Sequence, residues 1–346
     1  MTRMHTILCL FLFTSLTSCG ILGPEKEKPL EPGPRNYTWE VDTLYSPPGG
    51  YVYDIWGSSP NDVWAVLGTG TNTLWHFDGE SWEPWSERVG PALYSIYGFA
   101  NNDVWMGGND GKIYHFDGES WKLSVQIEIN EARLIDTYSI WGEPSNLYVA
   151  GIVVYFDDIP QSFIYRYDGK EWIKVLVTDF KVQLQRIRTK EERVFLQGIN
   201  INSQPDSFFF YALKGDELME IFSTPSSNNT EVISLHKIGE KIYFVVGSTI
   251  NKVKNNSLIK WKEISSPDFG YQIYGRHEKD IFLRMKNGLV HYNGEDISYL
   301  FDLNNTLFSI SNNAILFEDE VFFIVNDFDE GTNYIYHGIL TDQQEE

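Results

Sequence analysis

The sequence predicts an all-β fold, a β-propeller of seven four-stranded antiparallel blades. Three observations predict it. A unit of about 40 residues recurs along the chain, turn dipeptides occur at one fixed place in that unit, and a lone strand near the N-terminus matches the last strand of a unit. Six or eight blades fit the count of units less well than seven.

The repeat is clearest between residues 55 and 121. Residues 55–82 contain Ile-Trp-Gly, Asn-Asp-Val-Trp and His-Phe-Asp-Gly-Glu-Ser-Trp, and residues 96–121 repeat this order with Ile-Tyr-Gly at the start. Each unit opens with a short strand around one apolar anchor, which we expect in the core. The seven anchors are Ile55, Ile96, Ile140, Ile187, Leu235, Ile273 and Ile310.

A turn separates the third and fourth strands of six units. The turn pairs are Asp78-Gly79, Asp117-Gly118, Asp168-Gly169, Lys214-Gly215, Asn255-Asn256 and Asn293-Gly294. Asp-Gly and Asn-Gly predict two-residue type I′ turns, in which both residues have positive φ. A bulky residue follows at a constant offset: Trp82, Trp121, Trp172, Leu218, Ile259 and Ile297.

The seventh unit lacks a fourth strand, because the chain ends soon after the third strand at residues 334–338. Residues 39–44, Trp-Glu-Val-Asp-Thr-Leu, resemble the fourth strand of the third unit at residues 172–176. We therefore expect the N-terminal strand to complete the last blade and close the ring, which removes open sheet edges. The propeller is predicted to span residues 37–340, with an acidic tail at 341–346.

Residues 1–18 resemble the signal peptide of a bacterial lipoprotein. Arg3 precedes an apolar run at residues 7–13, which is too short to span a bilayer. Leu16-Thr17-Ser18-Cys19 resembles the lipobox, whose cysteine receives the lipid. The resemblance implies lipidation of Cys19 and a membrane-anchored place in the bacterial cell envelope. Because Gly20 rather than Asp follows, it favours the outer membrane; an ordinary secretory signal is the alternative.

The segment at residues 19–36 is rich in proline and alternating charge, which predicts a flexible, extended spacer. The second cysteine, Cys9, lies in the signal, so no disulfide is expected in the propeller. The formal net charge of −21 argues against nucleic acid as a partner. No calcium-loop, Walker or dinucleotide motif occurs, so we expect no metal and no cofactor. We expect a monomer.

A family resemblance covers the repeat region. Asp103-Val104-Trp105-Met106-Gly107-Gly108, followed by Tyr114-His115-Phe116 and Trp121, resembles a kelch-type blade. The double glycine is lost in the other blades. Over residues 39–340 the chain looks more like bacterial secreted or lipoprotein propellers with Trp-Gly-Ser-Ser-Pro-Asn-Asp-Val-Trp repeats. This resemblance implies a fold and a surface location, and it implies no reaction.

Two sets of polar residues are candidates for function. The residue before each anchor is polar, and we expect these residues to line the central channel. They are Asp54, Ser95, Ser139, Arg186, Ser234, Gln272 and Ser309. The alternative is a purely structural role, in which they only surround water in the channel. The second set lies in acidic loops that we expect on one face, and we expect this face to bind the ligand. These residues are Asp157, Asp158, Asp206, Asp327, Asp329 and Glu330.

The aromatic residues and the absent motifs bear on the type of function. Repeated tryptophans fit core packing between blades, namely Trp64, Trp82, Trp105, Trp121 and Trp172. Trp56 and Trp141 are better candidates for exposed contacts. No His-Glu-x-x-His or Gly-x-Ser-x-Gly motif occurs. The sequence therefore predicts a non-enzymatic propeller that binds a protein or glycan. The alternatives are a glycan hydrolase or lyase using loop-face carboxylates, and an envelope assembly scaffold.

Overall fold

The computed structural model describes residues 29–45, 50–69, 73–87, 89–156, 160–200, 206–224, 232–303, 308–327 and 332–341. The chain divides into two compact units, residues 1–31 and 32–346, and the second unit carries all the strands. The signal peptide, Cys19 and residues 342–346 lie outside the described residues. In the described part, no helix is long and apolar enough to cross a membrane.

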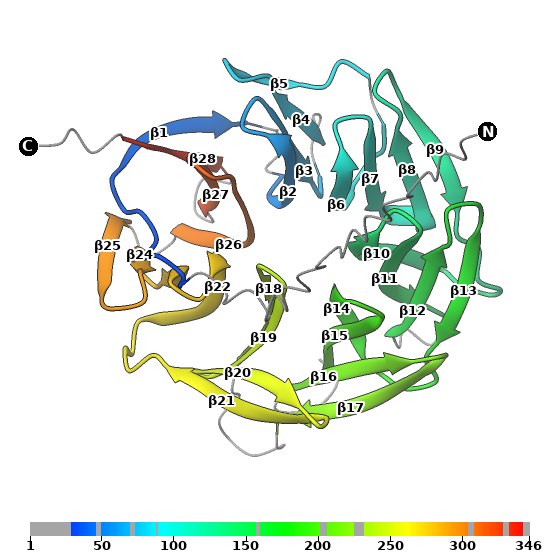
Figure 1. Ribbon diagram of the computed structural model, residues 1–346. Helices are drawn as coiled ribbons and strands as arrows, with labels where there is room; N and C mark the ends of the chain where they lie inside the picture. Colours follow the sequence, from blue (N-terminus) through cyan, green and yellow to red (C-terminus); the bar gives the residue numbers. More distant parts are fainter. Residues whose placement is uncertain are drawn as a thin grey trace, which may run out of the picture. The chain divides into compact units, whose positions relative to one another are not determined.

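The second unit is a ring of seven four-stranded antiparallel sheets (Figure 1), so the predicted seven-bladed propeller is confirmed. Blade 1 comprises β2 (Val52–Ser59), β3 (Asp62–Leu67), β4 (Leu74–Phe77) and β5 (Trp82–Pro84). Blade 2 comprises β6 (Leu93–Ala100), β7 (Asp103–Gly108), β8 (Lys112–Phe116) and β9 (Trp121–Gln126). Blade 3 comprises β10 (Leu134–Glu143), β11 (Asn146–Val154), β12 (Pro160–Tyr167) and β13 (Trp172–Val177).

The remaining blades follow the same plan, with the first strand of each next to the axis. Blade 4 comprises β14 (Gln183–Lys190), β15 (Arg193–Asn200), β16 (Ser207–Lys214) and β17 (Glu217–Ser223). Blade 5 comprises β18 (Ile233–Ile238), β19 (Lys241–Val246), β20 (Thr249–Lys254) and β21 (Ser257–Glu263). Blade 6 comprises β22 (Phe269–His277), β23 (Asp280–Met285), β24 (Gly288–Tyr292) and β25 (Ile297–Asp302). Blade 7 comprises β26 (Phe308–Leu316), β27 (Glu320–Asp327), β28 (Thr332–Leu340) and β1 (Tyr37–Leu44).

The N-terminal strand closes the ring, as predicted. β1 pairs with β28 along its whole length, from Tyr37 opposite Leu340 to Leu44 opposite Asn333. Trp39 packs edge-on against Phe301 of blade 6, with ring centroids 4.8 Å apart. The outer strand of blade 7 thus covers the edge of β28 and also contacts the preceding blade.

The anchors form the core between blades. All seven are at most 3% exposed, and most of the repeated tryptophans are buried as predicted. Trp64 shows why the spacing recurs, because it packs across the blade boundary on Phe116 and Trp121, with centroids 5.3 and 5.5 Å away. The outer positions Ile259 and Ile297 differ, since they are 48% and 47% exposed. At those two positions the sequence pattern does not mean burial.

The repeated histidines have a structural role. In blade 1, Asp62 Oδ1 accepts the indole N–H of Trp64 at 3.1 Å and lies 2.7 Å from His76 Nε2. The His76 and Trp64 rings lie across neighbouring strands, 4.0 Å apart. The same arrangement of acid, aromatic ring and histidine recurs in blades 2, 6 and 7: Asp103–Trp105–His115, Asp280–Phe282–His291 and Glu320–Phe322–His337. The histidines are therefore repeat equivalents that join second and third strands.

Blade 5 has a related arrangement, in which two lysines replace the acid and the histidine. Lys241 and Lys252 occupy the positions of the acid and the histidine. Glu278 of blade 6 supplies the missing carboxylate, 3.2 Å from Lys241 Nζ and 2.5 Å from Lys252 Nζ, and it accepts the Tyr243 hydroxyl proton at 2.8 Å. Although burial opposes it, these hydrogen bonds lower the pKa of Glu278 to about 2.

The predicted type I′ geometry is wrong for the four Asp-Gly and Asn-Gly turns. Phe77 pairs with Trp82, so four residues rather than two form the turn, and of the turn's residues Gly79 alone has positive φ, at +96°. Asp78 Oδ1 accepts the N–H groups of Glu80 and Ser81, both at 3.0 Å, and this favours the longer turn. The turns after Phe116, Tyr167 and Tyr292 repeat it. The two-residue turn with both φ values positive occurs at Asn255-Asn256.

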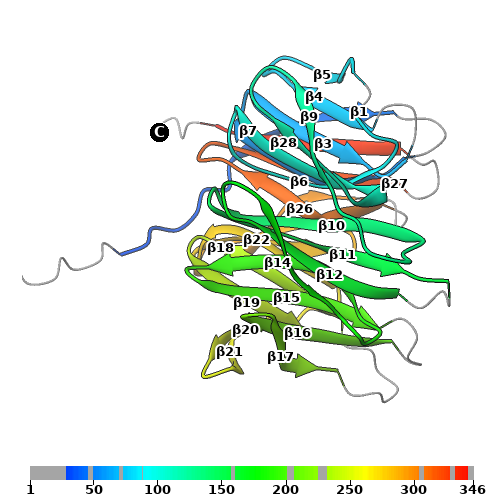
Figure 2. The same cartoon turned by 90° about the vertical axis from the view of Figure 1, so that its right-hand side faces the viewer.

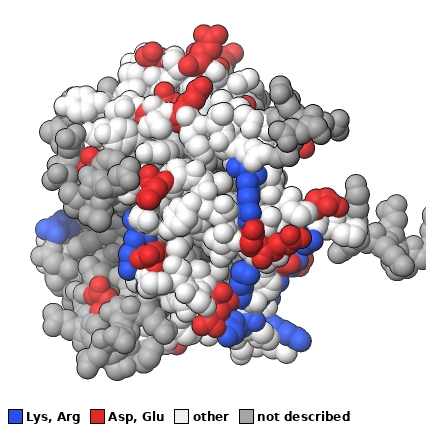
Figure 3. All heavy atoms as spheres, turned by 90° about the vertical axis from the view of Figure 1, so that its left-hand side faces the viewer, with Lys and Arg blue, Asp and Glu red and all other residues white. Residues whose placement is uncertain are grey.

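Strand direction defines two faces of the ring. We call the side where the inner strands begin the mouth face, and the opposite side, where β1 begins, the hairpin face. Figure 2 shows the ring edge-on, with the blue segment before β1 reaching it on the left. On the outer side that carries β1 and β25, acidic and basic side chains are interspersed (Figure 3).

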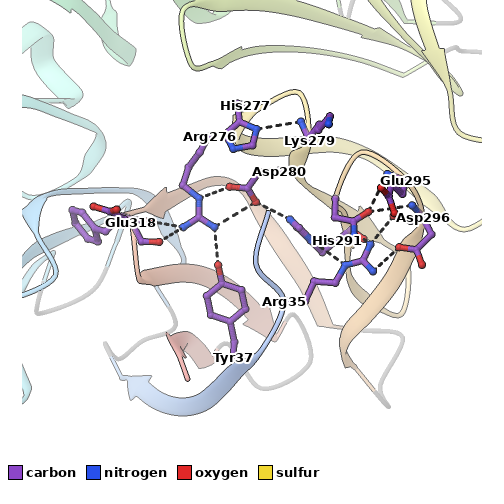
Figure 4. Close-up of polar contacts among 12 residues, drawn as sticks. Arg35, Tyr37, Arg276, His277, Lys279, Asp280, His291, Glu295, Asp296 and Glu318 are labelled. Atoms are coloured by element: carbon purple, nitrogen blue, oxygen red, sulfur yellow. Dashed lines mark hydrogen bonds and ion pairs between the residues drawn. The ribbon is translucent and has the colours of Figure 1, made fainter. Parts of the chain in front are cut away.

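The segment before β1 is fixed to blade 6 at the hairpin face (Figure 4). Gly33 N–H donates to the Lys279 carbonyl at 2.7 Å. Arg35 Nη1 forms an ion pair with Asp296 at 2.5 Å, and Nη2 donates to the His291 carbonyl at 3.1 Å. The last part of the predicted spacer is thus held against the propeller.

A second group of contacts continues from this segment into blades 6 and 7 (Figure 4). Arg276 donates to the Tyr37 hydroxyl at 2.7 Å and to the carbonyls of Phe317 and Glu318, each at 2.6 Å. Arg276 also forms an ion pair with Asp280 at 2.5 Å. Although burial alone would raise it, hydrogen bonds from His291 and Arg276 hold the pKa of Asp280 below its ordinary value.

We predict that removal of β1 opens the ring. A chain beginning at residue 46 exposes the edge of β28 and loses the packing of Trp39 and Leu44. Its melting temperature should fall by about 10 °C or more, and it should form oligomers in size-exclusion chromatography. A chain beginning at residue 29 keeps β1 and the contacts of Arg35, and should melt like the full chain without lipid. Equal melting of the two truncated chains would contradict ring closure by β1.

Candidate functional site

The inner strands of all seven blades line a pocket of about 650 Å³ on the axis of the ring. Four of the seven predicted channel residues border it: Asp54, Ser139, Arg186 and Gln272. Ser95 and Ser234 are fully buried and do not border the pocket. Ser309 lies on β26, and its side chain is outside the described part of the structure.

Most of these polar side chains also bind the backbone of the next blade. Asp54 Oδ2 accepts the Ile96 N–H at 3.0 Å, and Ser139 Oγ accepts the Ile187 N–H at 3.0 Å. Further contacts run from Arg186 to the Leu235 carbonyl at 3.2 Å, from Ser95 to the Thr137 carbonyl at 3.5 Å, and from Ser234 to the Tyr271 carbonyl. The polar position before each anchor thus links consecutive blades, and part of its recurrence has a structural cause.

Gln272 differs from the other channel residues. It is 7% exposed and borders the pocket, yet its Oε1 atom has no hydrogen-bond partner among the described residues. A buried amide oxygen without a donor is costly. Gln272 therefore carries a costly acceptor in the pocket wall, and this oxygen is itself closed to the channel.

Three tyrosines border the pocket toward the mouth face, and β-bulges place them there. β2 pairs Val52 with Leu67 and then Asp54 with Val66, which leaves Tyr53 as the extra residue. The register shifts at the same place in blades 2, 3 and 4, where the extra residues are Tyr94, Tyr138 and Gln185. Bulges change the direction in which a side chain points, and all four of these residues line the pocket.

We call Tyr53, Tyr94 and Tyr138 the tyrosine row. Their rings follow one another across three blades, with centroid distances of 5.2 and 5.3 Å. Tyr53 is 45% exposed, so the row reaches the surface at the mouth face. Burial, and next the charge of Asp136, raises the pKa of Tyr94 to about 12. The row therefore offers neutral hydroxyl groups and apolar ring faces at neutral pH.

Arg188 and aromatic rings line the pocket farther along the strands, toward the hairpin face. The Arg188 guanidinium lies 4.1 Å from the centre of the Trp141 ring, which is itself 4.5 Å from Tyr97. Its Nη1 donates to the Ile187 carbonyl at 2.7 Å, and its Nη2 donates to Asn313 Oδ1 of blade 7 at 3.4 Å. Trp141 and Trp56 both border this pocket. Trp56 is only 9% exposed, so any contact it makes with a ligand lies inside the channel.

The charges around the pocket are unlike those of the chain as a whole. Arg186, Arg188 and Lys237 border it, whereas Asp54 is the single carboxylate among its described lining residues. Lys237 lies 3.4 Å from Glu240, so the two arginines carry the excess positive charge. Burial, and next the two arginines, keeps the pKa of His236 well below its ordinary value, so this histidine is neutral.

Asp54 is held by hydrogen bonds and has little freedom for chemistry. Its Oδ1 accepts the Ile55 N–H at 2.9 Å, and its Oδ2 accepts the Ile96 N–H. Burial raises the pKa of Asp54 to about 6, although these hydrogen bonds and both arginines oppose the rise. A raised pKa in a pocket is typical of catalytic acids, but here both oxygens accept backbone N–H groups, one from its own strand and one from the next blade.

Most of the acidic loop set cannot be placed. Asp157, Asp158, Asp329 and Glu330 lie outside the described residues. Asp206 is exposed just before β16, at the mouth face, where it was expected. Asp327, at the end of β27, is buried at 3% exposure, so it offers no open carboxylate to a partner. Among the described residues, no group of three His, Cys, Asp or Glu side chains is arranged to hold a metal ion.

The sequence reasoning missed Arg188, the tyrosine row and Asp136. The tyrosines had a visible signal, because a tyrosine stands two residues before the anchor in each of the first three blades. Arg188 is the residue after its anchor, as Trp56, Tyr97 and Trp141 are. That position was considered only for its tryptophans. Nothing in the sequence signals the burial of Asp136, since the same strand also carries exposed residues.

We predict that Asp136 makes stability depend on pH. Burial, and next the charge of Asp110, raises the pKa of Asp136 from 3.8 to about 6. The folded chain therefore holds this proton more tightly than the unfolded chain, and stability is lost as pH rises from about 4 to about 6. Asp136→Asn should stabilise the protein by about 2 to 3 kcal/mol at pH 7.5 and by much less at pH 4, in denaturant titrations.

Exposed Asp206→Asn is the control for Asp136→Asn. It should change unfolding free energy little at either pH. If Asp136→Asn raises the free energy of unfolding by the same amount at pH 4 and pH 7.5, the pKa of Asp136 is not raised by burial.

Comparisons with known proteins identify the fold. No family model and none of the curated proteins matches the sequence. The structure of YCF48 bound to D1 peptide matches with a TM-score of 0.59 and 15% identity, over 90% of this chain and 100% of that chain. YCF48 from Cyanidioschyzon merolae matches with a TM-score of 0.57 and 12% identity, over 87% and 98%. The WD40 β-propeller domain of Doa1 matches with a TM-score of 0.53 and 12% identity, over 91% and 98%. At these identities the likeness is one of fold, a β-propeller.

Proposed function

We propose that this chain is a lipid-anchored, non-enzymatic propeller of the bacterial cell envelope that binds a protein partner at its mouth face. The observation that carries the proposal is the tyrosine row at the opening of the axial pocket. Tyrosines that are partly exposed and packed against one another in a rigid scaffold suit protein recognition, since they bury a large area at a low cost in entropy. One structural neighbour is bound to a peptide, D1, which supports a protein ligand here.

The place where the chain enters the ring supports an outward-facing mouth. Gly33 and Arg35 are held at the hairpin face, whereas the tyrosine row lies toward the mouth face. A lipid on Cys19, followed by the proline-rich segment, would pull on the hairpin face. The mouth face would then be free to meet a partner in the envelope, with the outer membrane as the proposed location.

The pocket gives less support to the glycan-processing enzyme with a carboxylate pair. Glycoside hydrolysis usually requires two carboxyl groups about 5 to 10 Å apart. Asp54 is the one carboxylate among the described residues of the pocket, and two backbone N–H groups occupy its oxygens. The mouth face could also bind a glycan or serve as a scaffold for envelope assembly. Identifying the captured native partner distinguishes these two roles.

We predict that the tyrosine row is needed for partner capture. The full lipidated chain, purified under mild detergent from its native envelope, should bring down a specific protein. The double variant Tyr53→Ala with Tyr94→Ala should reduce recovery about tenfold or more, because it removes two ring faces from the mouth. Tyr299→Ala is the matched control, since Tyr299 is 51% exposed on the outer strand β25; it should leave recovery unchanged.

Equal loss in both variants, or none in either, would contradict binding at the mouth. A parallel glycan array tests whether the ligand is a glycan. Selective glycan binding without protein capture would contradict the proposal that the partner is a protein. The anchor is tested in the same cells. Cys19→Ala should leave the chain unlipidated and in the soluble fraction, whereas normal lipid labelling of that variant would contradict the anchor.

A further inference from the structure

The axial pocket holds two buried guanidinium groups in a chain whose net charge is −21. We propose that Arg188 binds a carboxylate group, presented by an acidic segment of the protein partner that enters the channel, with Arg186 adding positive charge beside it. The inference rests on the proposed function, and it adds the chemistry by which the partner is recognised.

Arg188 is ordered and positioned for such a contact. The Trp141 ring supports one side of its guanidinium plane, and hydrogen bonds to the Ile187 carbonyl and to Asn313 fix its orientation. Both of those hydrogen-bond partners are neutral. Among the residues that the structure describes, no carboxylate lies within ion-pair distance of Arg188. A guanidinium held in this way retains N–H donors suited to a two-point contact with a carboxylate.

Within the described structure, Asp54 makes no hydrogen bond or ion pair with Arg188. Its oxygens accept the backbone N–H groups of Ile55 and Ile96. Burial, and next the repulsion from Arg186, lowers the pKa of Arg188 to about 9. A buried charge with incomplete compensation is costly, and an anion that enters the pocket removes part of this cost.

The other pocket residues favour an acidic peptide over a polyanion. The net charge of −21 repels an anion more strongly the more charge it carries, so a nucleic acid or a polyphosphate is disfavoured more than a segment with a few carboxylates. A single side-chain carboxylate fits within the pocket's 650 Å³. The tyrosine row at the opening suits a peptide chain.

The test uses defined peptides and the full chain carrying Cys19→Ala. Calorimetric titration compares an acetylated, amidated tetraglutamate with the matching tetraglutamine. The tetraglutamate should bind about tenfold or more tightly than the tetraglutamine, as expected for charge-assisted hydrogen bonds. Arg188→Gln should reduce this preference to about twofold or less. Arg193→Gln is the matched control: it lies in the same blade, is exposed, and does not border the pocket.

Three further readouts keep the proposal falsifiable. Thermal melting shows that Arg188→Gln is folded, and we expect no loss of stability because a buried charge is removed. If Arg188→Gln does not fold, Arg188→Lys, which keeps the charge but not the paired N–H donors, should lower the preference for tetraglutamate in a folded chain. Inorganic phosphate should displace the tetraglutamate only weakly.

Several results would overturn the proposal. These are equal binding of the two peptides, a preference that survives Arg188→Gln, or tight binding of phosphate without binding of tetraglutamate. Failure of the inference is distinct from failure of the proposed function. If the native partner is captured through the tyrosine row and Arg188→Gln does not weaken its capture, only the proposal that Arg188 binds a carboxylate of the partner is contradicted. If tetraglutamate binds as expected and no partner is captured, the proposed function falls.

Discussion

Closure of the ring by β1 is the constraint on which the other features depend. Each blade buries its apolar faces against two neighbours, so an unfinished blade 7 would expose surface on both sides of the gap. β1 supplies the missing strand along its full length, and Trp39 extends the contact to blade 6. The contacts of Arg35, Arg276 and Asp280 then fix the chain just before this strand (Figure 4). Closure by the first strand therefore also determines the face from which the N-terminal segment leaves.

Closure brings the seven inner strands together, and their side chains then divide into two groups. Asp54 and Ser139 use their polar atoms to bind the next blade, which keeps the spacing of the blades. The bulged tyrosines and Arg188 face the axis instead. The bulges occur in the first four blades, and the two channel arginines occur in blade 4 alone. The scaffold is thus regular, whereas the pocket is asymmetric, and the asymmetry gives it a preferred ligand chemistry.

The fold was predictable from the sequence because it depends on patterns repeated many times. One apolar anchor per unit, one turn per outer hairpin and a single unmatched strand at residues 39–44 were enough to give seven blades and their closure. Errors arose where a local interaction decided the outcome. Asp78 takes two backbone N–H groups with one oxygen, and this favours a four-residue turn over the two-residue turn that Asp-Gly suggests. The exposure of Ile259 and Ile297 follows from their place on outer strands, which the repeat pattern does not distinguish from buried ones.

The pocket was only partly predictable, because it depends on contacts between strands distant in sequence. Of the residues at the position before each anchor, Asp54, Ser139, Arg186 and Gln272 border the pocket. The sequence gives no sign that a bulge turns Tyr53 and Tyr94 toward the axis, nor that Arg188 reaches Asn313 across it. The choice of the acidic loops from the sequence followed their uneven lengths and clustered carboxylates, whereas the distinctive charge of the described pocket is positive and buried.

Hydrogen exchange of the full chain, alone and with its captured partner, tests most directly whether the partner binds at the mouth and channel. Binding there should slow exchange at the beginnings of the inner strands, at residues 52–56, 93–97, 137–141 and 185–188. The outer strands at residues 217–223 and 257–263 should exchange as before. Protection confined to the outer strands or to the hairpin face, with no change in the inner strands, would contradict the account.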